Sequence, residues 1–257
     1  MPQPLQALIF DVDGTLADTE RNGHRIAFNR AFAEAGLDWH WDVPRYGKLL
    51  AVTGGKERMT YYVDRYRPDY AKPADFAERV AVLHRAKTRH YTALLAGGAI
   101  PLRPGVRRLL AEARAAGLRL AIATTTTLDN VTALLAHSLA PDAESWFEVI
   151  AAGDVVPAKK PAPDIYHYAL KRMGLRAEEC LAFEDSQNGI RAARAAGLKT
   201  VITTNAYTHD HDFHGAALVL DGLGEPDRPF QALASAIALN GARYFDLALA
   251  RRVHADG

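Results

Sequence analysis

Short apolar runs recur along the chain and are separated by segments with the spacing of amphipathic helices. Runs of this kind are typical of strands buried on both faces of a parallel sheet. The predicted strands are Leu5–Phe10, Leu118–Thr124, Phe147–Ala151, Cys180–Glu184, Lys199–Thr204 and Ala217–Leu220. Strands that alternate with helices predict an α/β fold with a doubly wound parallel sheet.

Glycines mark the ends of the predicted helices between these strands. A glycine just after a helix readily adopts the left-handed conformation that ends it. On this basis we predict helices at Gly105–Ala116, Asp164–Met173 and Gln187–Ala196, which are followed by Gly117, Gly174 and Gly197. A helix-like pattern in Asn240–Gly257 fits either packing on the core or pairing with another chain.

A long stretch after the first strand has no strand pattern. Its helical segments are Arg21–Gly36, Glu57–Tyr66 and Phe76–Leu95, with Trp39, Trp41 and Tyr46 in an aromatic segment between the first two. We expect the tryptophans to pack between helices. The pattern predicts an all-helical cap domain, residues 18–99, inserted into a Rossmann-like core of residues 1–17 and 100–257. The expected hinge linkers are Leu16–Ala17 and Gly98–Pro104.

Charge and composition exclude several classes of protein. The 257 residues carry 31 basic and 30 acidic side chains, a formal charge of +1, which gives no general reason to bind nucleic acid or an anionic membrane. No apolar run approaches the ~20 residues of a membrane helix. The single Cys180 excludes an intramolecular disulfide and is interpreted as a small core residue. Met1–Gln6 lacks signal-peptide features, so we expect a cytoplasmic enzyme, as a monomer or alternatively a dimer.

Two acidic side chains follow the first predicted strand. Asp11 and Asp13 are two residues apart, so both should leave the same face at the carboxyl edge of the sheet, where such folds bind ligands. Gly14 then allows a sharp turn. Two carboxylates this close repel each other and require a divalent cation, a lysine or a shared proton. For an isolated pair, the alternative is a turn that is merely acidic.

Polar residues also follow three later apolar segments. Thr124–Thr127 follow a strand, where hydroxyls and amides can bind an anion or simply cap a helix. Lys160 precedes Pro161 in a turn, although a lone lysine is usually a surface charge. Glu184 and Asp185 end another strand, just before Ser186 and Gly189 open a helix.

The order and spacing of these groups, with the string DVDGTL, resemble the four motifs of the haloacid dehalogenase superfamily over Leu5 to about Leu220. The resemblance implies that Asp11 is the nucleophile and Asp13 the general acid and base. It also implies that Thr124 and the Thr125 amide hold the phosphoryl oxygens and that Lys160 offsets negative charge. Mg²⁺ would be held by Asp11, the Asp13 carbonyl and Asp185, with Glu184 either as a further ligand or in contact with the ligands.

Further strings, VTGGKER, HRAKT, ATTTT, KKPAPDIY and EDS, resemble the CbbY-type branch of this superfamily. That branch is associated with sugar bisphosphates such as xylulose 1,5-bisphosphate. The resemblance implies a magnesium-dependent phosphatase that acts on a small phosphorylated sugar through an aspartyl phosphate. The implied substrate-binding residues are Glu20, Gly54, Gly55, Lys56, Glu57, Arg58, His84, Lys87, Thr124, Thr125, Thr126, Thr127 and Lys160.

Within this set, a second phosphate needs a basic site, which Lys56, Arg58, His84 and Lys87 would supply. The alternative is that they are solvated charges on helix faces. Glu20 would contact sugar hydroxyls. The chain carries one residue more than the usual spacing between Glu20 and His24, which leaves the role of His24 open.

One histidine-rich segment admits two interpretations. His209, His211 and His214, with Asp210 and Asp212, are either a transition-metal cluster or a surface loop. We interpret them as a surface loop, because no second ligand pair accompanies them.

Three other activities use related chemistry. A phosphomutase of the β-phosphoglucomutase type shares the nucleophile and the acid/base aspartate, and the sequence does not separate it from a phosphatase. A haloacid dehalogenase is disfavoured, because that activity needs neither Asp13 nor the Glu184–Asp185 pair. A signalling receiver also phosphorylates an aspartate, but it needs no helical insertion.

Overall fold

The computed structural model describes residues 4–256 and divides into two compact units. The first unit runs to Asp18 and resumes at Pro101, and the second is Thr19–Ile100. The two connections between the units are paired within the first unit, where Ala17 forms an antiparallel bridge with Leu102. In the described range 4–256, no helix is both long enough and apolar enough to cross a membrane.

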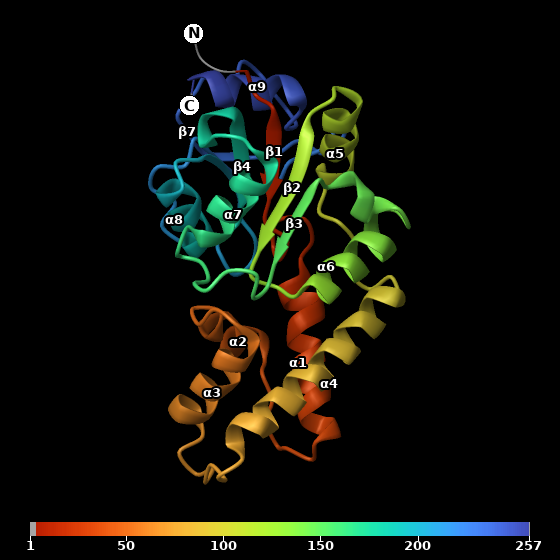
Figure 1. The fold of residues 1–257 in the computed structure, drawn as a ribbon, viewed down its shortest axis with the longest axis vertical. Helices are drawn as coiled ribbons and strands as arrows, with labels where there is room; N and C mark the ends of the chain where they lie inside the picture. The colour runs from red at the N-terminus through yellow and green to blue at the C-terminus, as the bar shows by residue number, and fades with distance from the viewer. Residues whose placement is uncertain (1–3, 257) are drawn as a thin grey trace. The chain divides into compact units, whose positions relative to one another are not determined.

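The first unit is built on a seven-stranded sheet of order β3-β2-β1-β4-β5-β6-β7. Its strands are β1 (Ala7–Phe10), β2 (Arg119–Thr124), β3 (Val149–Ala152), β4 (Cys180–Glu184), β5 (Lys199–Thr203), β6 (Leu218–Leu220) and β7 (Ala232–Ser235). All neighbouring strands are parallel except β6 and β7. This arrangement, shown in Figure 1, confirms the predicted doubly wound α/β fold. Strand β7 was not predicted, and its four residues are exposed, so no buried apolar pattern marks it.

Helices cover both faces of this sheet. Helices α7 (Asp164–Met173) and α8 (Gln187–Ala195) pack on the face that carries Ile9 and Ala182. Helix α5 (Val106–Ala115) contacts β2, helix α9 (Leu247–Asp256) contacts β4, and the two helices contact each other. The C-terminal pattern therefore packs back on the core.

Aromatic rings continue the packing on the α9 side. Phe10 stacks on Phe183 with 4.5 Å between ring centroids, and Phe183 meets Phe245 edge to face at 5.4 Å. Helix α6 (Leu128–Leu134) lies beside β3. The shorter elements of this unit are a π-helical turn at Leu135–Leu139 and 3₁₀ turns at Ala143–Trp146 and Ala177–Glu179.

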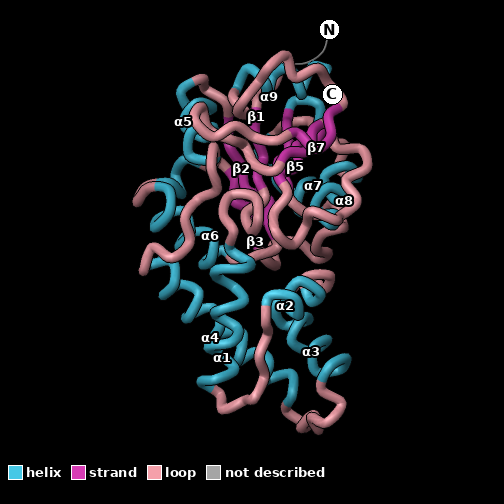
Figure 2. Tube along the Cα trace, turned by 180° about the vertical axis from the view of Figure 1, so that it is seen from behind, coloured by secondary structure: helices cyan, strands magenta, loops and turns pink. Residues whose placement is uncertain are grey.

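The second unit consists of helices joined by loops, as Figure 2 shows by colour. Its helices are α1 (Arg25–Glu34), α2 (Val43–Leu49), α3 (Gly55–Tyr66) and α4 (Phe76–Ala96). Trp39 and Trp41 are buried among aromatic rings, Trp41 lying 4.7 Å from Phe28 between centroids, which confirms that the tryptophans pack between helices. Helix α2 was not predicted, although the Asp42 carboxylate caps it by accepting from the Arg45 amide.

The first turn of this unit accommodates the additional residue noted between Glu20 and His24. Glu20–His24 form a π-helical turn that leads directly into α1, and the Arg25 amide donates to the Glu20 carbonyl. A π turn holds one more residue than an α turn. The predicted helix at Arg21–Gly36 is therefore a π turn followed by an α-helix that ends at Glu34.

Candidate active site

Three acidic side chains and a lysine meet at the carboxyl ends of β1 and β4. Asp11 directly follows β1, Glu184 ends β4 and Asp185 follows it, and the two strands are neighbours in the sheet. The Lys160 ammonium lies 2.7 Å from Asp11 Oδ1 and 2.5 Å from Glu184 Oε1, and it donates to the Ala123 carbonyl at 2.8 Å. Each of the four charged side chains is buried. Groups predicted from three separate segments thus form one cluster.

The cluster holds more acidic groups than basic ones, and its burial shifts their pKa values. Burial raises the pKa of Asp11 to about 7 against the opposing effect of Lys160. Burial also raises the pKa of Asp185, and the nearby Asp11 carboxylate raises it further. Burial lowers the pKa of Lys160, but Asp11 and Glu184 more than offset this, so the ammonium stays charged. One ammonium faces three carboxylates, and a divalent cation would balance the remainder.

The donor atoms fit such a cation. Carboxylate oxygens of Asp11, Glu184 and Asp185 lie within 4.8 Å of one another. Glu184 Oε2 is buried and has no hydrogen-bond partner, so an oxygen remains available as a ligand. Hard oxygen ligands of this kind suit Mg²⁺. Asp13 is half-buried in the loop that follows Asp11. Its backbone forms an isolated β-bridge with Ala17.

Two residues that were not assigned to the site support Glu184. The Tyr166 hydroxyl, on α7, donates to Glu184 Oε1 at 2.5 Å, and burial raises the pKa of Tyr166 so that it keeps its proton. Gly189, on α8, leaves room for the same carboxylate, because a Cβ there would lie 1.7 Å from Glu184 Oε2. The DIY string and the glycine in the helix were visible in the sequence, but their shared contact was not.

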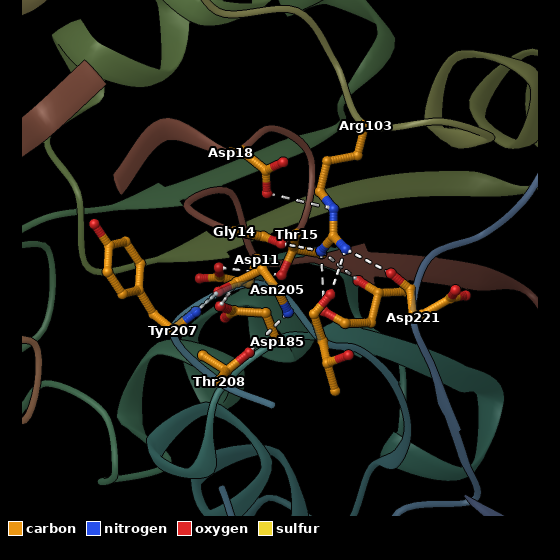
Figure 3. A network of polar contacts seen from close by, with 12 residues as sticks. Asp11, Gly14, Thr15, Asp18, Arg103, Asp185, Asn205, Tyr207, Thr208 and Asp221 are labelled. Atoms are coloured by element: carbon orange, nitrogen blue, oxygen red, sulfur yellow. Dashed lines mark hydrogen bonds and ion pairs between the residues drawn. The ribbon is translucent and has the colours of Figure 1, made fainter. Parts of the chain in front are cut away.

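Asp185 is held by Asn205. Asn205 lies just beyond β5. Its side-chain amide donates to Asp185 Oδ2 at 2.7 Å (Figure 3). Gly14 has a φ of +91°, and a Cβ there would lie 2.3 Å from Asp185 Oδ2. A glycine is required at this turn by both its backbone conformation and this close approach. Asn205 was missed, although a polar residue at the end of a strand at this edge was the available signal.

The threonine run lies at the end of β2. Thr124 is buried, and its Oγ1 accepts from the Thr126 amide at 3.3 Å. The Thr126 hydroxyl accepts a hydrogen bond from the side-chain amide of Asn130 at 3.0 Å. Thr127 stands at the position that caps α6, but its side chain makes no capping bond and its buried Oγ1 has no hydrogen-bond partner. Ordinary helix capping therefore does not account for the run.

Comparison with known proteins places this geometry in a family. Residues 5–197 match the haloacid dehalogenase-like hydrolases. The chain belongs to this family. Membership confirms the predicted superfamily and agrees with the prediction of a phosphatase-type enzyme.

Two relatives refine the similarity. The plasmid-encoded protein CbbY of Cupriavidus necator is 51% identical over 250 residues, which cover 97% of this chain and 97% of the relative. A crystal structure of CbbY from Rhodobacter sphaeroides with phosphate matches with a TM-score of 0.79 and 48% identity, over 85% of this chain and 94% of that one. A variant of that protein in complex with xylulose 1,5-bisphosphate matches equally well. These findings confirm the resemblance to the CbbY-type branch.

In the second unit of this haloacid dehalogenase-like hydrolase, Glu20 belongs to a polar group with Tyr46 and Arg58. The Tyr46 hydroxyl donates to Glu20 Oε2 and accepts from Arg58 Nη1 at 2.8 Å. Arg58 Nη1 also lies 3.7 Å from Glu20 Oε2. Sequence reasoning treated Tyr46 only as an aromatic residue and missed this link.

The predicted basic residues of the hydrolase differ in their surroundings. Lys87 is buried, and its ammonium lies 2.7 Å from His24 Nδ1, which gives His24 a contact with a predicted substrate-binding residue. Arg58 is also buried, whereas Lys56 is exposed. The alternative of solvated helix-face charges is therefore wrong for Arg58 and Lys87. Burial, with the charge of Lys87, lowers the pKa of His84 to about 4, so His84 is a neutral hydrogen-bonding group near pH 7.

Two glycines stand at the start of α3, and the second of them packs against His84. Gly54 has a φ of +98°, and a Cβ on Gly55 would lie 2.7 Å from His84 Nε2. Glu57 is exposed in the first turn of α3. Gly55 therefore allows His84 to approach the helix start.

The histidine-rich loop at 209–214 has a local structural contact. His211 Nδ1 accepts from the Gln187 amide at 3.2 Å, at the start of α8. Among residues 4–256, the side chains placed close enough together to hold a metal ion are Asp11, Glu184 and Asp185. The histidine-rich loop does not form a second such group.

Proposed function

We propose that this hydrolase is a magnesium-dependent phosphatase that removes one phosphoryl group from a sugar bisphosphate of the xylulose 1,5-bisphosphate type. The observation that carries the proposal is the buried Lys160 bridge between Asp11 and Glu184, beside a carboxylate oxygen that lacks a partner. Similarity to a CbbY variant in complex with xylulose 1,5-bisphosphate supports the substrate class.

In the first half-reaction, Asp11 is the nucleophile. Lys160 binds Oδ1 and fixes the carboxylate. An Asp11 oxygen attacks phosphorus, the bond from phosphorus to the sugar oxygen breaks, and Asp13 donates a proton to that oxygen. Thr124 and the Thr125 amide hold the phosphoryl oxygens. The products are the dephosphorylated position of the sugar and an aspartyl phosphate.

In the second half-reaction, Asp13 accepts a proton from water while that water attacks phosphorus. The acyl phosphate bond breaks, Asp11 is regenerated and inorganic phosphate leaves. Asp11, Glu184, Asp185 and the Asp13 carbonyl are the groups that would hold Mg²⁺. The bound ion would supply positive charge beside the carboxylates and the transferring phosphoryl group.

We attribute binding of the second, non-reacting phosphate to the second unit. Arg58 and Lys87 supply buried positive charge and Lys56 an exposed one. His84 contributes a hydrogen bond without net charge, since its pKa is lowered to about 4 by burial. Glu20, fixed by Tyr46, contacts sugar hydroxyls.

A phosphate-release screen tests the proposal. Sugar monophosphates and bisphosphates would be assayed with and without Mg²⁺, with Asp11→Asn as the inactive control. We expect magnesium-dependent release of one phosphate per bisphosphate. Isomerisation of a sugar monophosphate that requires a bisphosphate without consuming it would instead identify a phosphomutase, and substantial turnover by Asp11→Asn would contradict the nucleophile.

Lys56→Ala tests the second-phosphate assignment. Loss of a charge-assisted contact of roughly 1.5–3 kcal/mol should lower kcat/KM for a bisphosphate by about ten- to hundredfold. An aryl phosphate has no group for this contact, so its turnover should change little. Lys48→Ala, which removes another exposed lysine of the same unit, is the matched control. Equal effects of Lys56→Ala on both substrates would contradict the assignment.

A further inference from the structure

Arg103 is a buried arginine whose role no motif predicts. The residue is 9% exposed. Figure 3 shows its guanidinium between the loop that carries Gly14 and the segment at Asp221. Nη1 donates to the Gly14 carbonyl and to the Thr203 carbonyl at 3.0 Å, and Nη2 donates to the carbonyls of Thr204 at 2.5 Å and Asp221 at 3.0 Å.

These acceptors belong to different parts of the fold. Thr203 ends β5 and Asp221 directly follows β6, so both are fixed by the sheet. Gly14 lies in the turn after Asp13, which also has bonds within itself and to the linker. The Gly14 amide donates to the Ala17 carbonyl at 2.8 Å, and the Arg103 amide donates to the Leu16 carbonyl at 2.8 Å. Arg103 is thus a link between this turn and the carboxyl edge of the sheet.

We propose that Arg103 is a positioning residue that holds the turn of Asp13 in register with Asp11 during proton transfer. The inference rests on the proposed function, because it assigns Asp13 the proton-transfer role. A planar guanidinium presents five donors in a fixed fork, and several carbonyls can be held at once by this geometry. A lysine has one ammonium and cannot reproduce the fork. An error of about 1 Å in a reacting group can cost about a hundredfold in rate.

Arg103→Met and Arg103→Lys test the role against a matched control. Arg108 also links separate segments, donating to the Gly224 carbonyl at 2.9 Å and the Phe245 carbonyl at 3.1 Å. Arg108→Met should therefore weaken packing without disturbing the turn. For all three variants, kcat/KM would be measured with xylulose 1,5-bisphosphate and with p-nitrophenyl phosphate. Hydrogen exchange would be followed for the amides of residues 14–17.

The two substrates separate positioning from general damage. A sugar alkoxide needs a proton in order to leave, whereas p-nitrophenolate is stable without one. We expect Arg103→Met to lower kcat/KM for the bisphosphate by about a hundredfold and for the aryl phosphate by less than about tenfold. Arg103→Lys should behave similarly, since it keeps the charge but loses the fork. Arg108→Met should leave the ratio of the two values unchanged.

Exchange of residues 14–17 provides a measurement that does not depend on activity. It should accelerate in both Arg103 variants and remain unchanged in Arg108→Met. Equal losses on the two substrates, or unchanged exchange in the turn, would overturn the inference. If the wild-type protein releases phosphate from neither substrate, the proposed function is wrong, and exchange still decides whether Arg103 holds the turn. If Arg103→Met does not fold, Arg103→Lys provides the same comparisons.

Discussion

Replacing Gly189 by alanine is expected to damage the acidic cluster from a helix that carries no catalytic group. The new Cβ would lie 1.7 Å from Glu184 Oε2 and 2.1 Å from its Cδ, whereas ordinary contact begins at 3.4 Å. Glu184 is 1% exposed, and its other oxygen is bound by Lys160 and Tyr166. The carboxylate therefore has to leave its place, and with it the ligand oxygen proposed for Mg²⁺.

Two opposing effects set the change in stability. In an unconstrained helix, alanine is more stable than glycine by about 1 kcal/mol. Displacing Glu184 weakens its hydrogen bonds with Lys160 and Tyr166, and each bond to a charged group contributes about 1.5–3 kcal/mol. The loss exceeds the gain, so we expect Gly189→Ala to lower the free energy of unfolding by about 1–3 kcal/mol. A ligand displaced by more than 1 Å should lower kcat by about a hundredfold.

The assay combines urea unfolding with magnesium titration of phosphate release. Gly97→Ala is the control, because its Cβ would meet nothing closer than 3.5 Å at the end of α4. We expect Gly189→Ala to need more Mg²⁺ for half-maximal activity, and Gly97→Ala to match the wild type. A Gly189→Ala enzyme that is about 1 kcal/mol more stable and fully active would refute the reasoning, since helix propensity alone would then decide the outcome.

Three further predictions concern single side chains. Lys160→Ala should lower kcat by several orders of magnitude in a phosphate-release assay. Lys159→Ala should leave kcat nearly unchanged, because Lys159 pairs with Asp154 at 3.1 Å. Equal losses would show that the lysines are wrongly assigned. Burial raises the pKa of the Cys180 thiol to about 12, so a disulfide reagent should modify it slowly in the native protein and rapidly in urea, and rapid native reaction would contradict its burial. Burial lowers the pKa of His84 from 6.5 to about 4, so between these values the unfolded chain binds a proton that the folded chain does not, and stability should fall on acidification. In that pH range, His84→Gln should make the urea unfolding midpoint less dependent on pH. An unchanged pH dependence would mean that another group is responsible.

The sheet was predictable because its central strands are buried on both faces and the helices between them end at glycines. Strand β7 was not, because its residues are exposed and nothing in their pattern requires burial. Helix α2 had a readable start in Asp42 and the following proline, but the aromatic residues around it concealed the helical spacing. The π turn at Glu20–His24 depends on how an additional residue is accommodated, which spacing alone does not determine.

The acids and the lysine of the site were predictable because each follows an apolar segment at the same edge of the sheet. The roles of Tyr166, Asn205 and Arg103 were not predictable, because each side chain acts on a partner that is distant in sequence and is brought close only by the fold. The sequence grouped His84 with three basic side chains by residue type alone. Its burial, which lowers its pKa to about 4, is a property of the folded chain.

The bridge between Ala17 and Leu102 makes the inserted segment separable from the fold that carries it. The chain leaves the sheet-bearing unit and returns to it at adjacent positions, so the intervening residues can be exchanged without altering any strand pairing. If the inserted segment binds the second phosphate as proposed, recombination at these two points would change the substrate preference and leave the phosphate chemistry in place. The same two points are suitable junctions for building chimaeric enzymes.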